Sequence, residues 1–388
     1  MKILNVVKTN YGAGWAFNQA KWLHEVGVEI VCVMPENSVG YAELYQNQGI
    51  EIIARDFSLP VTKPWLLPAR IKDIRSVVEK VKPDIIHCHF VTNIMMVRIA
   101  LKGTPNIKRV FQIPGPLHLE SFFYRKAEIL LSDENDYWLP SCKKTRQYYQ
   151  DEGINEDRLF LCYYGGIDIT SFKKSQRILR NQFSISDDTP LIGMVCYFYK
   201  PKYHMLQFRG IKGHEDFINA FRMVKGKHPE AKAICIGGAW EDAQQYEQKV
   251  IKYAKEKLGE DIIFTGTRSD IKDIYKELDI AVCPSHSENL GAAAESLGAA
   301  VPTVATNIGG FPDIVIDGET GYLCDAKNPK DLAKKLNKML DNMDQANRMA
   351  QRGQVLVGEL LDINRTAKAV LKAYKTILGD KNENVILP

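Results

Sequence analysis

An alternation of strand-like and helix-like segments, which runs twice along the chain, constrains the fold more than any other feature. Strand-like apolar runs lie at 2–7, 29–34, 84–88, 108–113, 137–141 and 159–162, with helical patterns between them. After Gly165 and Gly166 the cycle restarts, and strands are expected at 191–197, 232–237, 262–266, 279–283, 303–306 and 320–323. Helices of this second half are expected at 213–226, 241–257, 270–276 and 291–299, and the segment 328–378 is helical. Such alternation predicts parallel sheets with helices on both faces.

The length of the chain predicts two domains. A chain of 388 residues is too long for one ordinary hydrophobic core. We expect an α/β fold of two doubly wound, parallel-sheet, Rossmann-like domains that face each other across a cleft, with ligands at the carboxyl ends of the strands. The predicted domains are residues 1–170 and 171–364, followed by a helix and tail over 365–388. A linker is expected near 168–188, where periodicity is lost.

Composition excludes several classes of protein. An apolar content of 45% and a charged content of 25% are typical of a soluble globular protein. A net charge of +4 is too small at this size to indicate a nucleic-acid partner, although it favours anionic substrates. The apolar run at the N-terminus is too short for a signal peptide, and no run reaches the length of a membrane span. We therefore expect a cytoplasmic protein.

Metal-binding patterns are missing from the sequence. The eight cysteines include no Cys-x-x-Cys pair, and six of them lie in or beside apolar runs, which indicates small buried side chains. His87-Cys88-His89 is the one metal-like cluster, but it has no third ligand nearby, so a packed or cleft-facing pair of histidines is favoured. No Asp-x-Asp occurs. We expect no metal and no cofactor.

The segment between Pro284 and Asp317 carries the clearest chemistry. Two carboxylates, Glu288 and Glu295, flank a turn between a buried strand and an Ala-rich helix, and that turn is Asn289-Leu290-Gly291. The free N–H groups at a helix N-terminus bind anions, and glycine permits close approach. Carboxylates repel phosphate but accept hydrogen bonds from hydroxyl groups. The implied ligand therefore carries a diphosphate and several hydroxyl groups, as a nucleotide-sugar does.

This segment resembles the signature of the group 1 glycosyltransferases, also called glycosyltransferase family four, which have the GT-B fold. The matching positions are Pro284, Ser285, Glu288, Gly291, Glu295, Pro302, Gly309, Gly310 and Pro312. Two departures stand out: six residues separate the glutamates where the family more often has seven, and Asp313 replaces the usual Glu. A solvated helix start with a single Glu is the alternative, and nine matches in order make it improbable.

Weaker matches extend the resemblance over nearly the whole chain. They lie at 1–14, at 82–89, at Gly165-Gly166-Ile167-Asp168 with Phe172, at Ile211-Lys212-Gly213 and at Asp279. The resemblance implies a retaining enzyme of the hexosyltransferase type. Its donor, a UDP-sugar by expectation, would lie on the C-terminal domain, and a glycan or lipid-linked acceptor would lie on the N-terminal one. It also implies a role in cell-surface polysaccharide or glycoconjugate biosynthesis, and a C-terminal helix that returns to the N-terminal domain.

The resemblance assigns a cationic role near the leaving diphosphate. Lys212 matches the family's Lys-Gly motif, and it would act with the backbone amides of 289–291 because preorganised donors stabilise developing negative charge best. Tyr197 stands where the family has Arg. Arg209, in a longer loop, is a candidate for the second charge because a guanidinium suits bidentate phosphate contact. A solvated basic loop is the open alternative.

Other donor contacts follow from the same resemblance. Glu295 would bind the ribose hydroxyls and Glu288 the hydroxyls of the sugar. The loop with Thr267 and Arg268 follows a strand, and its main chain would contact the base. Gly309-Gly310 would bring a loop close to the sugar, with an ordinary turn as the alternative.

The N-terminal half carries fewer specific signals. Pro114 occupies the position of the family's catalytic His, and His118 is either its replacement or a structural histidine. Gly12, Ala13 and Gly14 are expected to border the acceptor and the donor phosphates. The segment 60–70, which mixes Trp, Lys and Arg, has two functional interpretations, contact with a membrane at its inner face or shaping of the acceptor site, and a packed loop is the default.

Two rival functions stay open. One is an NAD-type oxidoreductase, because Gly12-Ala13-Gly14 follows a strand and Glu36 ends the next one, although Phe17 replaces the third glycine. The other is a GT-B protein that binds a nucleotide-sugar without catalysing transfer, since Tyr197 and Pro114 replace family residues. The sequence names neither the sugar and nucleotide nor the acceptor, the linkage or the oligomeric state.

Overall fold

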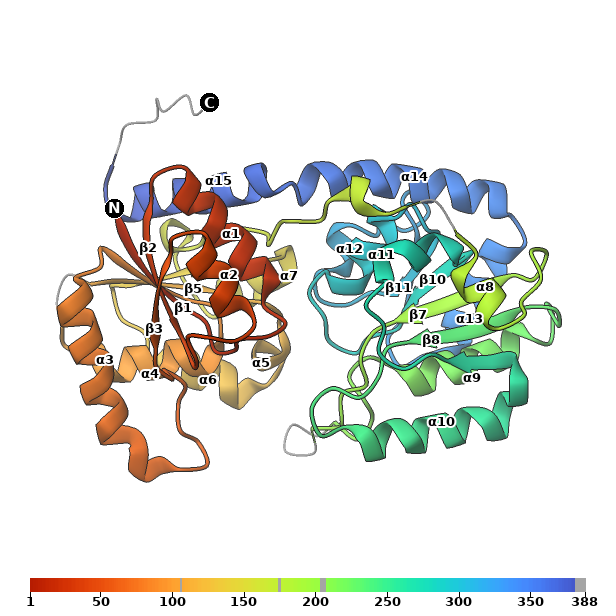
Figure 1. Cartoon of the computed structure of the whole chain (residues 1–388), viewed down its shortest axis with the longest axis horizontal. Coiled ribbons are helices and arrows are strands. Elements are labelled where there is room, and N and C mark those ends of the chain that lie inside the picture. The colour runs from red at the N-terminus through yellow and green to blue at the C-terminus, as the bar shows by residue number, and fades with distance from the viewer. Residues whose placement is uncertain (105–106, 174–175, 203–206, 381–388) are drawn as a thin grey trace. The chain divides into compact units, whose positions relative to one another are not determined.

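The computed structural model describes residues 1–104, 107–173, 176–202 and 207–380. They form two compact units, which are shown in Figure 1. The first comprises Met1–Gly166 together with the C-terminal segment from Leu360, and the second comprises Ile167–Glu359. Each unit is built on one six-stranded sheet.

The first unit contains a wholly parallel sheet in the order β3-β2-β1-β4-β5-β6. Its strands are β1 (Lys2–Val6), β2 (Glu29–Met34), β3 (Glu51–Ala54), β4 (Ile85–Cys88), β5 (Lys108–Gln112) and β6 (Asp136–Leu139). Successive side chains of a strand point to opposite faces, so Ile3 and Leu4 enter two different hydrophobic cores.

Helices cover both faces of this sheet (Figure 1). One core is formed with α1 (Gly14–Glu25), α2 (Tyr41–Asn47) and α15 (Ile363–Ile377). The other is formed with α3 (Leu67–Val81), α4 (Val91–Leu101) and α7 (Lys143–Asp151). Two shorter helices, α5 (Leu117–Glu120) and α6 (Phe122–Leu130), follow β5.

The amphipathic pattern of α3 explains why this segment is a surface helix. Its buried residues are Ile74, Val77, Val78 and Val81, which recur at the three- and four-residue spacing of one helical face. The helix ends at Lys82, which adopts a left-handed conformation with φ of 51°. The chain can then turn directly into β4.

The second unit repeats the same topology, in the order β12-β11-β10-β7-β8-β9, again with every pair parallel. The strands are β7 (Leu191–Val195), β8 (Lys232–Ile236), β9 (Ile262–Phe264), β10 (Ile280–Cys283), β11 (Thr303–Thr306) and β12 (Tyr322–Cys324). The strand order reverses between β1 and β4 in the first unit and between β7 and β10 in the second. In open α/β sheets ligands bind at the carboxyl ends of the strands at such a switch point.

Helices pack on both faces of the second sheet as well. One core is formed with α9 (His214–Val224), α10 (Gln244–Leu258), α13 (Pro329–Leu340) and α14 (Met343–Leu360). The other is formed with α8 (Ile178–Gln182) and α11 (Ile271–Ile274). The helix α12 (Gly291–Gly298) connects β10 to β11.

The predicted fold class is confirmed, and three local expectations need correction. β3 was not predicted, because only four residues of it pair. The predicted strand at 159–162 is wrong, since only Leu159 forms an isolated bridge, to Trp138. The units divide after Gly166, and α8 occupies part of the range expected to be a linker. Within the described ranges, no helix has both the length and the apolar character of a membrane span.

Candidate active site

The loop that follows β10 carries the predicted signature and is held in place by buried backbone contacts. His286 donates its backbone N–H to the carbonyl of Ile211 at 2.7 Å. The hydroxyl of Thr306, at the end of β11, donates to the carbonyl of Ser285 at 2.7 Å. The loop is therefore fixed at the switch point between β7 and β10, where it leads into α12.

Lys212 and Glu288 form an ion pair at this switch point. The Lys212 Nζ donates a hydrogen bond to Oε2 of Glu288, and the two side chains are only 19% and 15% exposed. Burial alone lowers the pKa of Lys212, but the Glu288 carboxylate outweighs it, and the net pKa is raised. The other carboxylate oxygen of Glu288 accepts the backbone N–H of Asn289 at 3.2 Å. Glu288 thus connects a charged ammonium group to the start of α12.

Glycines allow the backbone to close around this pair. Gly213 has a φ of 77°, and a Cβ there would lie 2.0 Å from the carbonyl oxygen of Pro284. Gly309 has a φ of 52°, and a Cβ there would lie 1.8 Å from the carbonyl oxygen of Glu288. A Cβ on Gly310 would lie 2.8 Å from the carbonyl oxygen of Asn289. These close approaches within the protein account for the Gly309-Gly310 pair without a ligand.

Among the residues that the structure describes, Glu295 is the one signature carboxylate without a hydrogen-bond or ion-pair partner. It lies on α12 and is partly buried, and burial raises its pKa, whereas the charges of Lys272 and Lys212 act to lower it. Over the described ranges, no hydrogen bond or ion pair is made by its side chain. A half-buried carboxylate without a protein donor is suited to accept hydrogen bonds from ligand hydroxyl groups.

Arg209 is bound to a neighbouring carboxylate. Its Nη1 donates to Asp216 Oδ1 at 2.9 Å, and the Nε2 of His286 lies 2.5 Å from the other oxygen of the same side chain. Asp216 is buried in the first turn of α9. The structure therefore links Arg209 to the loop of Glu288 through Asp216 and His286, two residues that sequence reasoning missed because their types are common on any helix or loop.

The loop after β9 lies at the same edge of the sheet. Thr267 packs against the end of β8, since a Cβ on Gly238 would be 2.6 Å from its hydroxyl oxygen. The guanidinium of Arg268 donates to Asp270 at 2.8 and 2.6 Å and to Gln182 at 2.8 Å. The side chain of Arg268 is therefore occupied within the protein.

Tyr197 stands at the position that the family gives to an Arg, and it packs on an aromatic residue. Its ring lies edge to face on Trp240, with centroids 5.1 Å apart. Nearby, His214 stacks on Phe198 at 3.9 Å, and burial lowers its pKa to about 3. A neutral His214 cannot supply the missing positive charge.

The environment of His118 favours the structural interpretation. The ring lies 5.8 Å from that of Phe111, and its Nε2 is buried and has no partner among the residues that the structure describes. Burial lowers the pKa of His118 to about 4. His118 is therefore a poor candidate for a catalytic base at neutral pH.

The His87–His89 pair is packed in the first unit. His89 binds the Tyr164 hydroxyl at 2.9 Å and Asn5 Oδ1 at 2.7 Å, and His87 binds the hydroxyl of Tyr374. Burial lowers the pKa of His89 to about 3. No group of three metal-ligating side chains is found in the described ranges.

The predicted loop at Gly12, Ala13 and Gly14 begins α1. Gly12 has a φ of 72°, and Ala13 is a buried residue at the helix N-terminus. A Cβ on Gly14 would lie 2.4 Å from the hydroxyl oxygen of Tyr41. Packing thus explains Gly14 without a dinucleotide.

Two family models match successive parts of the chain. The model of glycosyltransferase family 4 matches residues 15–169, and the model of the group 1 glycosyl transferases matches residues 203–355. Among curated proteins, the N-acetyl-alpha-D-glucosaminyl L-malate synthase of Bacillus anthracis is 23% identical over 54% of this chain and 50% of its own length. The sulfoquinovosyl transferase SQD2 of Arabidopsis thaliana is 25% identical over 84% of this chain and 63% of its own length. The match therefore spans less than two thirds of either relative.

Solved structures with the same architecture are also found. HepE of Anabaena in complex with UDP has a TM-score of 0.79 at 18% identity, and the match covers 97% of this chain and 100% of that one. A sucrose-phosphate synthase of Thermosynechococcus elongatus has a TM-score of 0.76 at 15% identity, with 98% and 99% covered. At these identities the likeness establishes the fold. Together with the two family models, it shows that the chain belongs to the group 1 glycosyltransferases of the GT-B fold.

Proposed function

We propose that this protein transfers a hexose from a nucleotide diphosphate sugar, with UDP as the favoured nucleotide, to a glycan or lipid-linked acceptor. The reaction would retain the anomeric configuration, need no metal, and serve the synthesis of cell-surface polysaccharide or glycoconjugate. The observation that carries this proposal is the Lys212–Glu288 pair beside α12, together with the unpartnered carboxylate of Glu295.

The choice of donor rests on the site and on the relatives. HepE is described in complex with UDP and with UDP-glucose. In this chain Glu295 would accept hydrogen bonds from the ribose hydroxyls, and Glu288 from a hydroxyl of the sugar. Before the donor binds, Lys212 and Glu288 neutralise each other, so neither leaves a buried charge unpaired.

The same pair accounts for the chemistry of the leaving group. Departure of the sugar places negative charge on the diphosphate, and the ammonium of Lys212 and the backbone amides at the start of α12 are fixed donors for that charge. The raised pKa of Lys212 keeps the ammonium charged at neutral pH. An oxygen of the departing diphosphate can then take the proton of an acceptor hydroxyl that attacks from the same face, which gives retention.

Binding and turnover test this function separately. Wild-type protein is screened by thermal shift with UDP, UDP-glucose and other nucleotide-sugars, and slow hydrolysis of the donor is then followed with and without EDTA. We expect stabilisation by UDP compounds and hydrolysis that persists in EDTA. NMR of the first-formed product from an α-linked donor should show an α linkage, and a β-linked product would contradict retention.

A second candidate is a nucleotide-sugar-binding protein that does not catalyse transfer. The observation in its favour is that Tyr197, packed on Trp240, replaces a cationic family residue. Binding of UDP-glucose with neither donor hydrolysis nor transfer to any acceptor would support it. The oxidoreductase alternative predicts fluorescence changes on addition of NADH, and we expect none.

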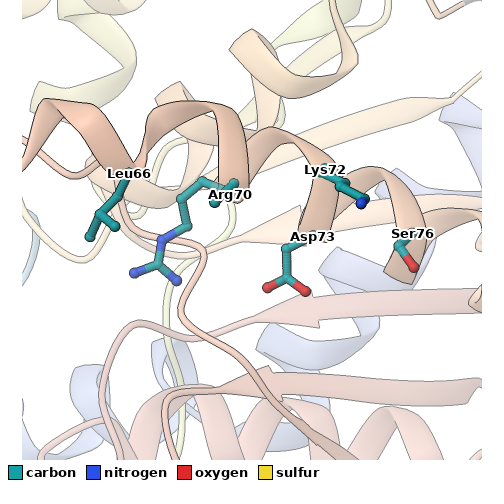
Figure 2. A pocket seen from close by; sticks show the side chains of 6 residues that line it. Leu66, Arg70, Lys72, Asp73 and Ser76 are labelled. Carbon is teal, nitrogen blue, oxygen red and sulfur yellow. The ribbon is translucent and has the colours of Figure 1, made fainter.

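We also propose that the first unit contacts the inner face of a membrane through the segment 60–70, which leads into α3. Val61 and Trp65 are 70% and 69% exposed, and the exposed Lys63 lies between them. A cavity of about 460 Å³ adjoins this segment and is lined by Leu66, Ala69, Arg70, Lys72, Asp73 and Ser76. Figure 2 shows how the side chains of Leu66, Arg70 and Lys72 lie around it. Exposed apolar side chains beside basic ones suit an anionic lipid surface.

Vesicle binding tests this contact. Wild-type protein should sediment with vesicles that contain phosphatidylglycerol, and Trp65→Ser should reduce the bound fraction several-fold. Phe123→Ser is the matched control, because Phe123 is 82% exposed in the same unit but lies on α6. Equal losses for the two variants would contradict a specific membrane surface at Trp65.

A further inference from the structure

Three aromatic side chains, Tyr197, Tyr199 and Trp240, gather beyond the carboxyl ends of β7 and β8. We refer to them as the aromatic cluster. The ring of Tyr197 lies at 60° to that of Trp240 with centroids 5.1 Å apart, and the centroid of Tyr199 lies 6.0 Å from that of Trp240. The Nζ of Lys212 is 5.6 Å from the centroid of Tyr199. The aromatic cluster therefore adjoins the Lys212–Glu288 pair.

Backbone hydrogen bonds fix the aromatic cluster in the second unit. Phe198 donates to the carbonyl of Gly238 at 2.9 Å, and Trp240 donates to the carbonyl of Phe198 at 3.0 Å, so the pairing of β7 and β8 continues past the strands. Phe198 is buried in the core. Because side chains alternate along an extended segment, Tyr197 and Tyr199 point away from that core, toward the face that holds Trp240.

The aromatic cluster keeps accessible rings and unused polar groups. Tyr197 is 36% exposed, and Tyr199 and Trp240 are partly exposed. Within the described part of the chain, neither tyrosine hydroxyl nor the indole N–H has a hydrogen-bond partner. The next residue, Glu241, has a φ of 51°, a conformation that is unfavourable for a residue with a side chain and is often found at ligand sites.

The chemistry of the aromatic cluster suits a sugar ring. The face of an aromatic ring is negative and attracts the C–H groups on the apolar face of a pyranose, while the hydroxyl groups around the sugar find donors and acceptors at the tyrosine and tryptophan tips. The negative ring faces offer no attraction to a diphosphate, which could use only the donors at the ring tips. Lys212, which Tyr199 contacts, is paired with Glu288, the carboxylate that we assign to the sugar, so the aromatic cluster lies beside that ion pair.

We infer that Tyr197, Tyr199 and Trp240 form a subsite that stacks against a hexopyranose ring and helps to select the sugar. This inference rests on the proposed function. The ring belongs either to the donor sugar or to the first sugar of the acceptor, and the two sources are separable by experiment.

Tryptophan fluorescence offers a selective measurement, because Trp240 is the only one of the five tryptophans in the second unit. Calorimetric titration with UDP, with UDP-glucose, and with methyl glucoside in the presence of UDP gives the affinities of wild-type protein, Trp240→Phe, Trp240→Ala and Tyr197→Ala. Fluorescence in the same titrations reports the contact with Trp240 in the proteins that retain it. Trp65→Phe is the control, since Trp65 is exposed in the first unit. Circular dichroism and thermal melts show whether each variant is folded.

We expect UDP affinity to stay within about twofold in all variants and sugar affinity to fall about three- to tenfold in Trp240→Ala and Tyr197→Ala. Trp240→Phe should retain most of the sugar affinity but lose the fluorescence change. A loss of affinity for UDP-glucose identifies the donor sugar. A loss of affinity for methyl glucoside, with the affinity for UDP-glucose unchanged, identifies an acceptor sugar. Equal losses for UDP and the sugars, or no loss in either folded alanine variant, would overturn the inference.

Failure of the proposed function gives a different result. If wild-type protein binds no UDP compound, the donor assignment fails, and titration of wild type and Trp240→Phe with methyl glucoside alone then tests the aromatic cluster by itself. Absence of a Trp240-dependent signal in that titration would overturn the inference independently.

Discussion

The ammonium of Lys212 and the carboxylate of Glu288 meet from the two sides of the switch point in the second sheet. Lys212 precedes α9, which follows β7, and Glu288 lies in the loop after β10. Each side chain is the main counter-charge of the other in a largely buried position. A substitution of either one therefore leaves a partly desolvated charge behind, and the two should differ in their effects on binding and turnover.

Lys212→Ala should lower turnover more than donor binding, because charge on the leaving diphosphate is greatest in the transition state. We expect kcat to fall at least about a hundredfold, by analogy with the loss of one preorganised donor. Lys227→Ala is the control, since Lys227 pairs with Asp341 at the surface. Steady-state kinetics of donor hydrolysis gives kcat and KM for both variants. A change confined to KM would contradict the assignment.

Glu295→Ala and Glu288→Ala should separate nucleotide binding from sugar binding. Glu295→Ala should weaken UDP and UDP-sugar alike, whereas Glu288→Ala should weaken only the sugar-bearing donor. Loss of a hydrogen bond to a charged group costs about 1.5–3 kcal/mol, so effects of about tenfold or more are expected. Calorimetric titration checks both variants. Wild-type affinity for both ligands in both variants would refute these roles.

Gly309→Ala should destabilise the second unit and abolish donor binding. Its φ is 52°, and the added Cβ would lie 1.8 Å from the carbonyl oxygen of Glu288. Gly318→Ala is a matched control, because Gly318 has a φ of 81° but no atom within 4 Å of the new Cβ. Denaturant unfolding should show that Gly318→Ala lowers the free energy of unfolding by about 1 kcal/mol and that Gly309→Ala lowers it by about 3 kcal/mol or more. Similar losses of unfolding free energy in the two variants would show that the loop can shift to accommodate the new Cβ.

Stability should fall as the pH drops below 6.5. Burial lowers the pKa of His89 and of His214 from 6.5 to about 3, so the unfolded chain binds protons that the folded one excludes. The stability of the folded state is fully present above pH 6.5 and is lost as the pH falls toward 3. Each of the two histidines should lower the free energy of unfolding at pH 5 by about 2 kcal/mol.

Unfolding at pH 7 and pH 5 tests this dependence. His214→Gln should reduce the difference between the two pH values by about 2 kcal/mol, whatever its effect at pH 7. An unchanged difference in His214→Gln would mean that folding does not lower the pKa of His214.

The sequence predicted the sheets and the signature loop well, because both depend on local patterns. An apolar run such as 280–283 is typical of a strand in a sheet that helices cover on both faces. Glu288 and Gly291 lie within a few residues of each other, in one turn. β3 escaped prediction because its four residues alternate little in burial and pair along one edge only. Arg209 could not be placed, because its partner Asp216 lies on a different element and only the folded chain brings them together.

The aromatic cluster shows the same limit. Tyr197 and Trp240 are 43 positions apart in the sequence and meet only because β7 and β8 are neighbours in the sheet. His118 illustrates a second limit, since its position near the expected one suggests a catalytic role, while burial lowers its pKa to about 4. Chemical type and spacing suggest a role, but desolvation decides it.

The assignment of α15 to the first unit sets an order of events during synthesis. Residues 167–359 form a continuous stretch, so the second unit has all its strands before the ribosome reaches the last helix. The first unit lacks Val370 and Tyr374, which fill its core against β1 and α1, until the ribosome has passed the second unit and translated α15. The half of the chain that is made first is therefore the half that is completed last, and its apolar face needs protection while the rest is translated.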